Sequence, residues 1–190
     1  KKLHALVEDP SPVLPILEAL KDDPEKYVQK SVGNHLNDIS KNHPELVVAT
    51  CKKWMKTAGP ERKWIIARGL RTLMKEGHSG ALELMGFPPA KNLRVELDVS
   101  PSQIPIGSSV ELQVSLKNEY GQTQKLLIDY AVTYVRKQQN TGRKVFKGTT
   151  KTLQASEETT FTKKHPMKVT TTRALYPGEH LVEILVNGER

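Results

Sequence analysis

The sequence has very little cysteine and no long hydrophobic run. Its only cysteine, Cys51, excludes an intramolecular disulfide and a zinc site built on cysteines, and it favours a reducing compartment. No run of about 18 apolar residues is present, so we expect no membrane-spanning helix and no membrane partner. The chain therefore has to be stabilised by ordinary packing of its apolar side chains.

Motifs of metal-dependent and phosphate-binding chemistry are also missing. The six histidines are scattered, with no HExxH pattern and no pair at i, i+4. No glycine-rich phosphate loop, GxSxG turn or CxxC pair occurs. We therefore expect neither a metal nor a cofactor.

Positive charge is what the chain has in excess. The 29 Lys and Arg residues outnumber the 21 Asp and Glu residues, which gives a formal charge of +8, with +3 over residues 1–90 and +5 over residues 91–190. A basic surface gains affinity for nucleic acid because it releases condensed counterions. Many basic proteins bind nothing acidic, so the net charge alone leaves both interpretations open.

The first half of the chain, residues 1–87, has the apolar spacing of helices. We expect helices over residues 12–20, 24–41, 44–57, 60–76 and 81–85, separated by proline and glycine breaks. Their apolar stripes predict the core residues Val28, Val32, Leu36, Ile39, Val47, Cys51, Trp54, Ile66, Leu70 and Leu73.

These helices repeat. Pro24 and Pro60 each open a long helix, 36 residues apart, and each helix ends in a basic residue and a turn before the next one. A period of this length is typical of paired helices stacked as a solenoid, which normally needs about three repeats to be stable. Two and a fraction are present, so we expect earlier repeats to precede this region.

From residue 92 the apolar residues recur with a period of two. Apolar and polar residues alternate, and the pattern predicts about seven strands in the last 100 residues. The fold class expected is α plus β in two domains, with HEAT-like solenoid repeats over residues 1–87 and an immunoglobulin-like antiparallel β-sandwich over residues 92–190. Residues 88–91, which begin with two prolines, are expected to be a short linker.

A polar stripe follows each of the two long helices. Both stripes should adjoin on the concave face of a solenoid, and they contain the residues Lys30, Asn34, Asn37, Asp38, Lys41, Trp64, Arg68, Arg71 and Lys75. Arginine, lysine and asparagine facing one way suit phosphate oxygens, and a neighbouring aromatic suits stacking on a base or sugar. The alternative is the solvated face of ordinary amphipathic helices.

Asp38 is the one carboxylate among these cations and amides. It can be a surface ion pair, which contributes little to stability. It can also be the anion that stabilises a positive charge developing on a sugar during glycosidic cleavage.

The second half carries two stretches without acidic residues. Residues 130–156 contain six cations and residues 159–178 contain four, namely Arg136, Lys137, Arg143, Lys144, Lys147, Lys151, Lys163, Lys164, Lys168 and Arg173. These can form one basic edge that binds a polyanion. They can equally be solvated strand faces, or lysines that protect strand edges from association.

Several runs resemble a known family. Residues 31–41 read SVGNHLNDISK, residues 43–47 read HPELV, residues 68–73 read RGLRTL and residues 75–78 read KEGH. They resemble the AlkC branch of the AlkD-like HEAT-repeat DNA glycosylases, and the NHLND string over residues 34–38 is the most specific part.

The second half resembles the immunoglobulin-like domain that ends some members of that branch. The matching runs are DYAVTYV over residues 129–135, KVFK over residues 144–147 and YPGEH over residues 176–180. The resemblance thus covers nearly the whole chain.

The resemblance implies an enzyme that hydrolyses the N-glycosidic bond of alkylated bases, chiefly 3-methyladenine, in double-stranded DNA. It implies a catalytic role for Asp38 alone. From the polar stripes and the basic stretches we expect DNA contacts by Lys30, Asn34, Asn37, Trp64, Arg68, Arg71, Lys75, Arg136, Lys137, Arg143, Lys144 and Arg173. We further expect a monomer without cofactor that acts in the bacterial cytoplasm, on the nucleoid.

Members of the family carry more helical repeats, with further carboxylates, ahead of the region matched here. We therefore expect a C-terminal portion that binds DNA weakly and has little or no glycosylase activity alone. Two other classes stay open, namely a non-catalytic DNA-binding scaffold of the same architecture and a solenoid that docks proteins.

Overall fold

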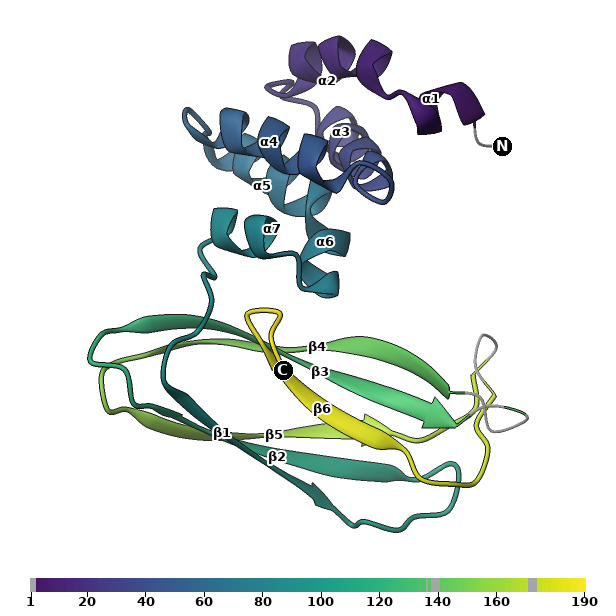
Figure 1. Ribbon diagram of the computed structural model, residues 1–190. Coiled ribbons are helices and arrows are strands. Elements are labelled where there is room, and N and C mark those ends of the chain that lie inside the picture. The colour runs from purple at the N-terminus through teal and green to yellow at the C-terminus, as the bar shows by residue number, and fades with distance from the viewer. Residues whose placement is uncertain (1–2, 136, 138–140, 171–173) are drawn as a thin grey trace. The chain divides into compact units, whose positions relative to one another are not determined.

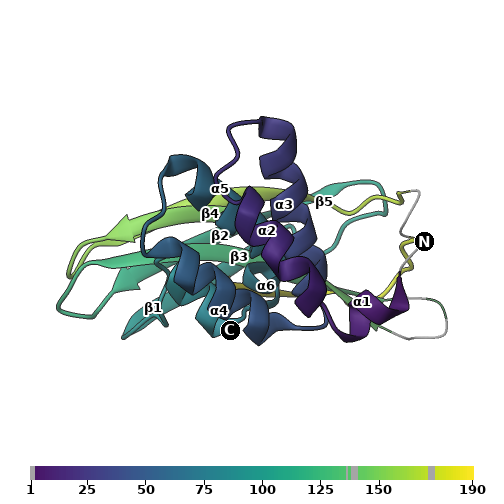
Figure 2. The same cartoon turned by 90° about the horizontal axis from the view of Figure 1, so that it is seen from above.

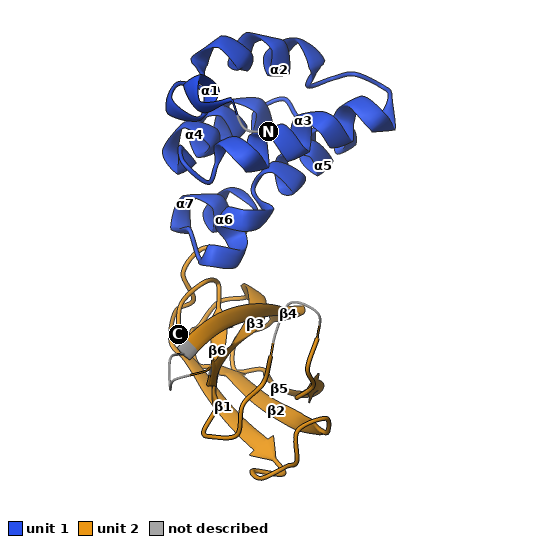
Figure 3. Cartoon of the chain, turned by 90° about the vertical axis from the view of Figure 1, so that its right-hand side faces the viewer, with its two compact units in different colours: residues 1–85 blue, residues 86–190 orange. Residues whose placement is uncertain are grey.

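The computed structural model describes residues 3–135, 137, 141–170 and 174–190. They form two compact units, Lys1–Met85 and Gly86–Arg190, here named the helical unit and the β unit (Figure 1 and Figure 3). In the described part of the chain no helix is both long and apolar enough to cross a membrane.

The helical unit is built from short helices. In chain order they are α1 (His4–Glu8), the 3-10 turn η1 (Ser11–Val13), α2 (Leu14–Leu20), α3 (Lys26–Ile39), α4 (Pro44–Met55), α5 (Pro60–Gly69), α6 (Arg71–Glu76) and α7 (Ser79–Leu84). Pro44 and Pro60 begin α4 and α5, where the absent N–H is one that has no helical partner anyway. α2 packs against α3, and α3 packs against α5 (Figure 2).

The apolar stripes of these helices meet in one core. Leu36, Trp54, Ile66 and Leu70 are buried there, and so is the thiol of Cys51. The indole Nε1 of Trp54 donates a hydrogen bond of 2.7 Å to the carboxylate of Glu18, which satisfies its one polar group. The core predicted from helical spacing is therefore confirmed, except that Val28 is only partly buried.

The single helix predicted over residues 60–76 is wrong, because the chain breaks at Leu70 into α5 and α6. Leu70 has φ −90° and ψ −1°, and α6 restarts directly after it. The side chain of Asn37 on α3 accepts a hydrogen bond of 3.1 Å from the backbone N–H of Thr72 in the first turn of α6. An amide from another helix thus satisfies an N–H that the break would leave without a partner.

Two glycines allow α3 and α5 to approach closely. A Cβ on Gly69 would lie 2.9 Å from Leu36 Cβ, and a Cβ on Gly33 would lie 3.0 Å from Arg68 Cβ. The backbones therefore come together where both helices lack a side chain. This contact brings the polar edge of α3 alongside the ends of α5 and α6.

Over its described residues the β unit has six strands in two sheets. The strands are β1 (Leu93–Ser100), β2 (Ser109–Asn118), β3 (Gln124–Val135), β4 (Thr141–Leu153), β5 (Glu158–Pro166) and β6 (Leu181–Val186). The strand orders are β1-β2-β5 and β4-β3-β6, and every pairing is antiparallel (Figure 1). A seventh predicted strand, over residues 168–173, lies partly outside the described residues, and Lys168 and Val169 are not in a strand.

Alternate residues of the two sheets form the core between them. Leu112 and Val114 of β2 face Tyr130, Val132 and Ile128 of β3, and all are buried. This alternation is what the period of two in the sequence predicts for sheets with one apolar face.

The predicted linker is attached to the β unit. Asn187 Nδ2 donates to the carbonyl of Pro88 at 2.6 Å, and Gln124 bonds both the N–H and the C=O of Lys91. Residues 88–91 are thus fixed to the sheets by side chains from distant parts of the chain.

Candidate nucleic-acid interface

The centre of the candidate site is a single amide oxygen that contacts two arginines. Asn34 Oδ1 accepts a hydrogen bond of 3.0 Å from Arg68 Nε and one of 3.1 Å from Arg71 Nη1. Arg71 Nη1 also donates to the carbonyl of Arg68 at 3.1 Å. α3, α5 and α6 together hold two guanidinium groups side by side. The repulsion between their positive charges would otherwise disfavour this arrangement.

Arg68 is further restrained on both sides. Its aliphatic stem lies against the backbone of α3 at Gly33, and its guanidinium lies 5.3 Å from the ring centroid of Trp64. Trp64 is 42% exposed, so its ring has a face available to solvent beside a cation. The structure thus brings together four of the predicted residues, Asn34, Trp64, Arg68 and Arg71.

Asn37 lies elsewhere than the sequence predicts. Only 2% of its surface is exposed, and its side-chain oxygen accepts a hydrogen bond from the backbone N–H of Thr72. We therefore remove Asn37 from the residues expected to contact DNA and assign it a structural role. The helical spacing places it beside the polar stripe, but on the side that α6 covers.

Asp38 follows Asn34 by one helical turn and is exposed. Lys41 Nζ donates a hydrogen bond of 2.6 Å to Asp38 Oδ1. Among the described residues no contact joins Asp38 to Arg68 or Arg71.

The carboxylate of Asp38 borders a hollow of about 400 Å³. Leu6 and Val7 of α1 line one side of it, and His35 and His43 line another. His43 Nε2 also contacts the carbonyl of Val7 at 2.7 Å, which connects α1 to the start of α4. Asp38 is therefore an exposed anion at the rim of a partly apolar hollow.

Lys30 and Lys75, the remaining predicted contacts of the helical unit, are both exposed. Neither has an ion pair among the interactions of the described residues. Their ammonium groups are accessible to an anion in solution.

The cations predicted in the β unit fall into three groups. Arg136 and Arg173 lie outside the described residues. Lys137 is exposed, and Lys144 Nζ lies 5.5 Å from the ring centroid of Phe146. Arg143 Nε donates to Glu183 Oε2 at 3.1 Å, so this arginine already has an anionic partner.

Three lysines of the β unit share an unusual position on edge strands. Lys144 and Lys151 of β4 pair with the buried Val132 and Leu126, and Lys163 of β5 pairs with the buried Leu112. Directly paired residues point to the same face, so these lysines occupy inward-facing positions at the edge of each sheet. We call Lys144, Lys151 and Lys163 the lysine flank.

Sequence reasoning missed several residues that build the site. Gly33 and Gly69 allow the approach of α3 to α5, and His35 and His43 line the hollow beside Asp38. A signal for the glycines exists, since they are 36 residues apart, the same interval as Pro24 and Pro60. Among the described residues no group of three His, Cys, Asp or Glu side chains could hold a metal ion.

Comparisons with known proteins bear on both units. Residues 94–190 match the family model described as "Uncharacterised protein YhaZ, C-terminal Ig-like domain", and residues 1–62 match the one described as "DNA alkylation repair enzyme". The chain is 40% identical over 190 residues to "Uncharacterized protein YhaZ" of Bacillus subtilis, a match that covers 100% of this chain and 52% of that protein.

A solved structure is similar over the full length of the chain. It is the Pseudomonas fluorescens alkylpurine DNA glycosylase AlkC bound to DNA containing an abasic site analog, with a TM-score of 0.94 at 38% sequence identity. The match covers 100% of this chain and 53% of that one. The chain thus spans about half the length of the relatives it matches.

Proposed function

The chain belongs to the family of the YhaZ C-terminal Ig-like domain, and on that premise we propose that it acts on DNA in the removal of alkylated bases such as 3-methyladenine. In this proposal the helical unit is part of a HEAT-like solenoid that binds the double-stranded substrate, and the β unit is an immunoglobulin-like sandwich that adds basic contacts. Similarity to an alkylpurine DNA glycosylase bound to DNA supports the proposal.

The observation that carries the proposal is the pair of arginines fixed by Asn34. Arg68 uses Nε and Arg71 uses Nη1 to bond the amide oxygen, so most of the remaining N–H groups of both guanidiniums are available to an anion. Two guanidiniums held together before binding lose little conformational entropy when a phosphate arrives. A DNA phosphate is the ligand that this geometry and charge suit best.

Asp38 is the residue we propose for the chemistry. An alkylated adenine is cationic and leaves readily, so the enzyme mainly has to stabilise the positive charge that develops on the sugar. Lys41 Nζ donates a hydrogen bond to Oδ1 of Asp38, and Oδ2 has no hydrogen-bond partner among the described residues. A carboxylate with one free oxygen at the rim of a hollow can stabilise an oxocarbenium ion and orient a water molecule.

Salt-dependent binding tests the arginine pair. The affinity of the chain for duplex DNA should fall steeply with salt, and Arg68→Ala/Arg71→Ala should reduce the slope of log K against log salt by about two, because each arginine neutralises about one phosphate. Fluorescence anisotropy with a labelled duplex measures this slope. Lys52→Ala, at an exposed lysine of α4, should leave the slope close to the native value if binding is localised.

A chimera tests the chemistry. In it, this chain replaces the matching part of Pseudomonas fluorescens AlkC, and release of 3-methyladenine from methylated DNA is measured. Asp38→Asn in the chimera should lower release by orders of magnitude while DNA binding persists. Release that survives Asp38→Asn would contradict the catalytic role, and an unmodified chimera that binds DNA but releases no base would favour the non-catalytic scaffold.

A further inference from the structure

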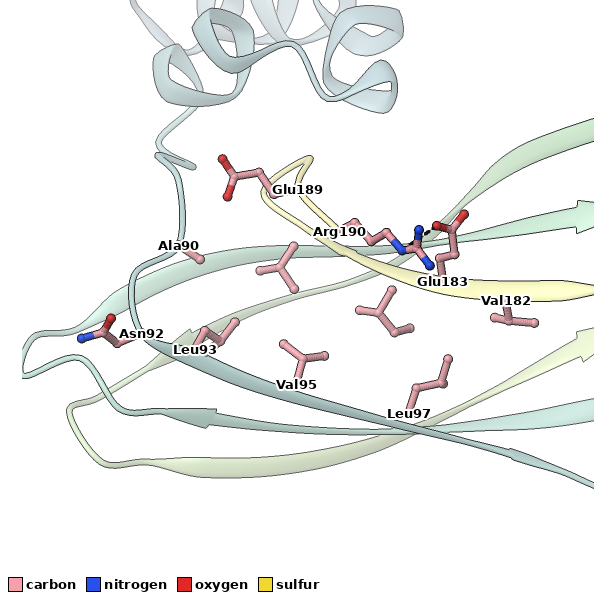
Figure 4. A pocket seen from close by; sticks show the side chains of 11 residues that line it. Ala90, Asn92, Leu93, Val95, Leu97, Val182, Glu183, Glu189 and Arg190 are labelled. Carbon is pink, nitrogen blue, oxygen red and sulfur yellow. Dashed lines mark ion pairs between the residues drawn. The ribbon is translucent and has the colours of Figure 1, made fainter.

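The β unit has an open side between β1 and β6 that the proposed function does not use. β1 pairs only with β2 and β6 only with β3, so in the described chain the outer edge of each strand has no neighbouring strand. A groove of about 600 Å³ lies between these two edges (Figure 4).

Two rows of apolar side chains line this groove, together with the polar residues Asn92 and Glu189 and the ion pair of Arg190 with Glu183. Leu93, Val95 and Leu97 come from β1, and in Figure 4 they extend into the space between β1 and β6. Val182, Ile184 and Val186 come from β6. Val95 keeps 38% of its surface exposed although it occupies an inward-facing position of its sheet, so the core is incompletely covered here.

The opposite side of the β unit shows what a protected edge looks like in this chain. There the lysine flank places charged side chains at inward-facing positions of the edge strands β4 and β5, which opposes pairing with another sheet. The groove side has only apolar residues at the equivalent positions of β1 and β6. The edges of β4 and β5 are therefore protected against pairing with another sheet, and the edges of β1 and β6 are not.

The charges on the outer face of β1 indicate what could pair with it. This face carries Arg94, Glu96 and Asp98, and Arg94 Nη2 already lies 2.6 Å from Glu96 Oε1. In an antiparallel pair of two identical strands, directly opposite residues must point to the same face. A register centred on Val95 places Arg94 opposite Glu96 of the second strand, and Glu96 opposite its Arg94.

Each neighbouring register brings like charges together. Centring the pair on Glu96 places Arg94 opposite Asp98 but also places two glutamates opposite each other. Centring it on Arg94 places two arginines opposite each other, and centring it on Leu97 places Glu96 opposite Asp98. Like charges directly opposite are destabilising and unlike charges are favourable. Among these four registers, only the one centred on Val95 pairs unlike charges without also placing like charges opposite each other.

We propose that a second copy of this chain pairs with the outer edge of β1, antiparallel and centred on Val95. The interface is symmetric, because the same strand contributes from both copies. The sheet β1-β2-β5 becomes continuous with its counterpart, and the apolar rows of β1 from the two copies lie next to each other. This goes beyond the proposed function and replaces the monomer expected from the sequence.

Sedimentation equilibrium of the full 190-residue chain over a wide range of concentration tests the pairing. The expected result is a mass that rises with concentration from 21.3 kDa to twice that value. Val95→Lys introduces the protection found on the lysine flank and should give a monomer throughout. Val169→Lys, at a residue of the same unit that is 58% exposed, is the matched control and should leave the dimer intact.

Charge reversal tests the register. Glu96→Arg places arginine opposite arginine and should weaken dimerisation about tenfold, whereas Arg94→Glu/Glu96→Arg restores unlike pairs and should return affinity to near the native value. Circular dichroism verifies that each variant is folded. A native chain that stays at 21.3 kDa at every concentration overturns the proposal, and so does a dimer that Val95→Lys leaves unchanged or that the double reversal does not restore.

Discussion

At the scale of single residues, Asn34 differs from the other polar residues of its helix because its partners are two cations. Its amide oxygen accepts from Arg68 and Arg71, and it lies in a partly buried position that water reaches less easily. Asn34 therefore positions the groups that we expect to bind phosphate, and its own contact with DNA is not required for this role.

We expect Asn34→Ala to weaken binding of duplex DNA about tenfold, because two hydrogen bonds of about 1 kcal/mol each no longer orient the arginines. Both positive charges remain, so the slope of affinity against salt should be unchanged. Anisotropy titrations at several salt concentrations separate the two effects. Ser31→Ala, at an exposed position of the same helix, is the control and should bind like the native chain.

The sequence identified the cations of this site but not how they are held. Helical spacing places Arg68, Arg71 and Asn34 on exposed faces, and that much can be predicted from periodicity. Whether Asn34 or Asn37 faces the arginines depends on the angle at which α3 meets α5 and α6, which is set by tertiary packing. Asn34 is therefore a residue of the site and Asn37 a structural residue, because they lie on different sides of α3.

At the scale of elements, the contact between α3 and α5 depends on the absence of side chains. Gly69 ends α5 directly against Leu36 of α3, both residues are buried, and the two helices leave no room there for an added carbon. The same packing fixes where Arg68, one residue earlier, leaves the helix.

We expect Gly69→Ala to lower the free energy of unfolding by about 1–3 kcal/mol, because the new Cβ would lie 2.9 Å from Leu36 Cβ. Alanine is favoured over glycine in helices by about 1 kcal/mol, so a net loss shows that the steric conflict dominates. Urea denaturation monitored by circular dichroism measures the difference.

Gly59→Ala is the matched control for this prediction. At Gly59 the nearest atom to an added Cβ is 3.7 Å away, an ordinary contact, and the backbone φ of −71° suits any residue. Its stability should change by no more than about 0.5 kcal/mol. A Gly69→Ala variant as stable as this control would contradict the steric argument.

The elements themselves could largely be predicted from periodicity, and their ends and breaks could not. The stripes that include Leu36, Trp54 and Leu73 locate the helices because burial follows a period of 3.6 residues. The break at Leu70 depends on an amide supplied by α3, which no local pattern records. In the same way, alternation predicts the strands, but only their register reveals that Lys144, Lys151 and Lys163 face inward.

At the scale of the whole molecule, the resemblance to the AlkC branch stated from short motifs is confirmed by the matches to both units. The boundary between the compact units falls after Met85, whereas the sequence predicts a helical region over residues 1–87 and a linker over residues 88–91. The amino-acid composition predicted only a basic protein that could bind nucleic acid, whereas the short motifs identified the family.

The 190-residue chain by itself should bind duplex DNA and release little or no 3-methyladenine. It spans about half the length of its relatives, and Asp38 is the one carboxylate of this chain that we propose for the chemistry. Incubation with methylated DNA followed by chromatography of released bases measures this, with Pseudomonas fluorescens AlkC as the positive control. Robust release by the chain alone would show that Asp38 and the residues around it suffice.

The burial of Cys51 has a consequence for the conditions under which such a protein has to work. Burial raises the pKa of its thiol to about 12, so at neutral pH only about one molecule in 10⁵ carries the reactive thiolate. Methylating agents that damage DNA also attack nucleophilic sulfur. With its single thiol protonated and enclosed in the core, the chain offers these electrophiles no thiolate at its surface.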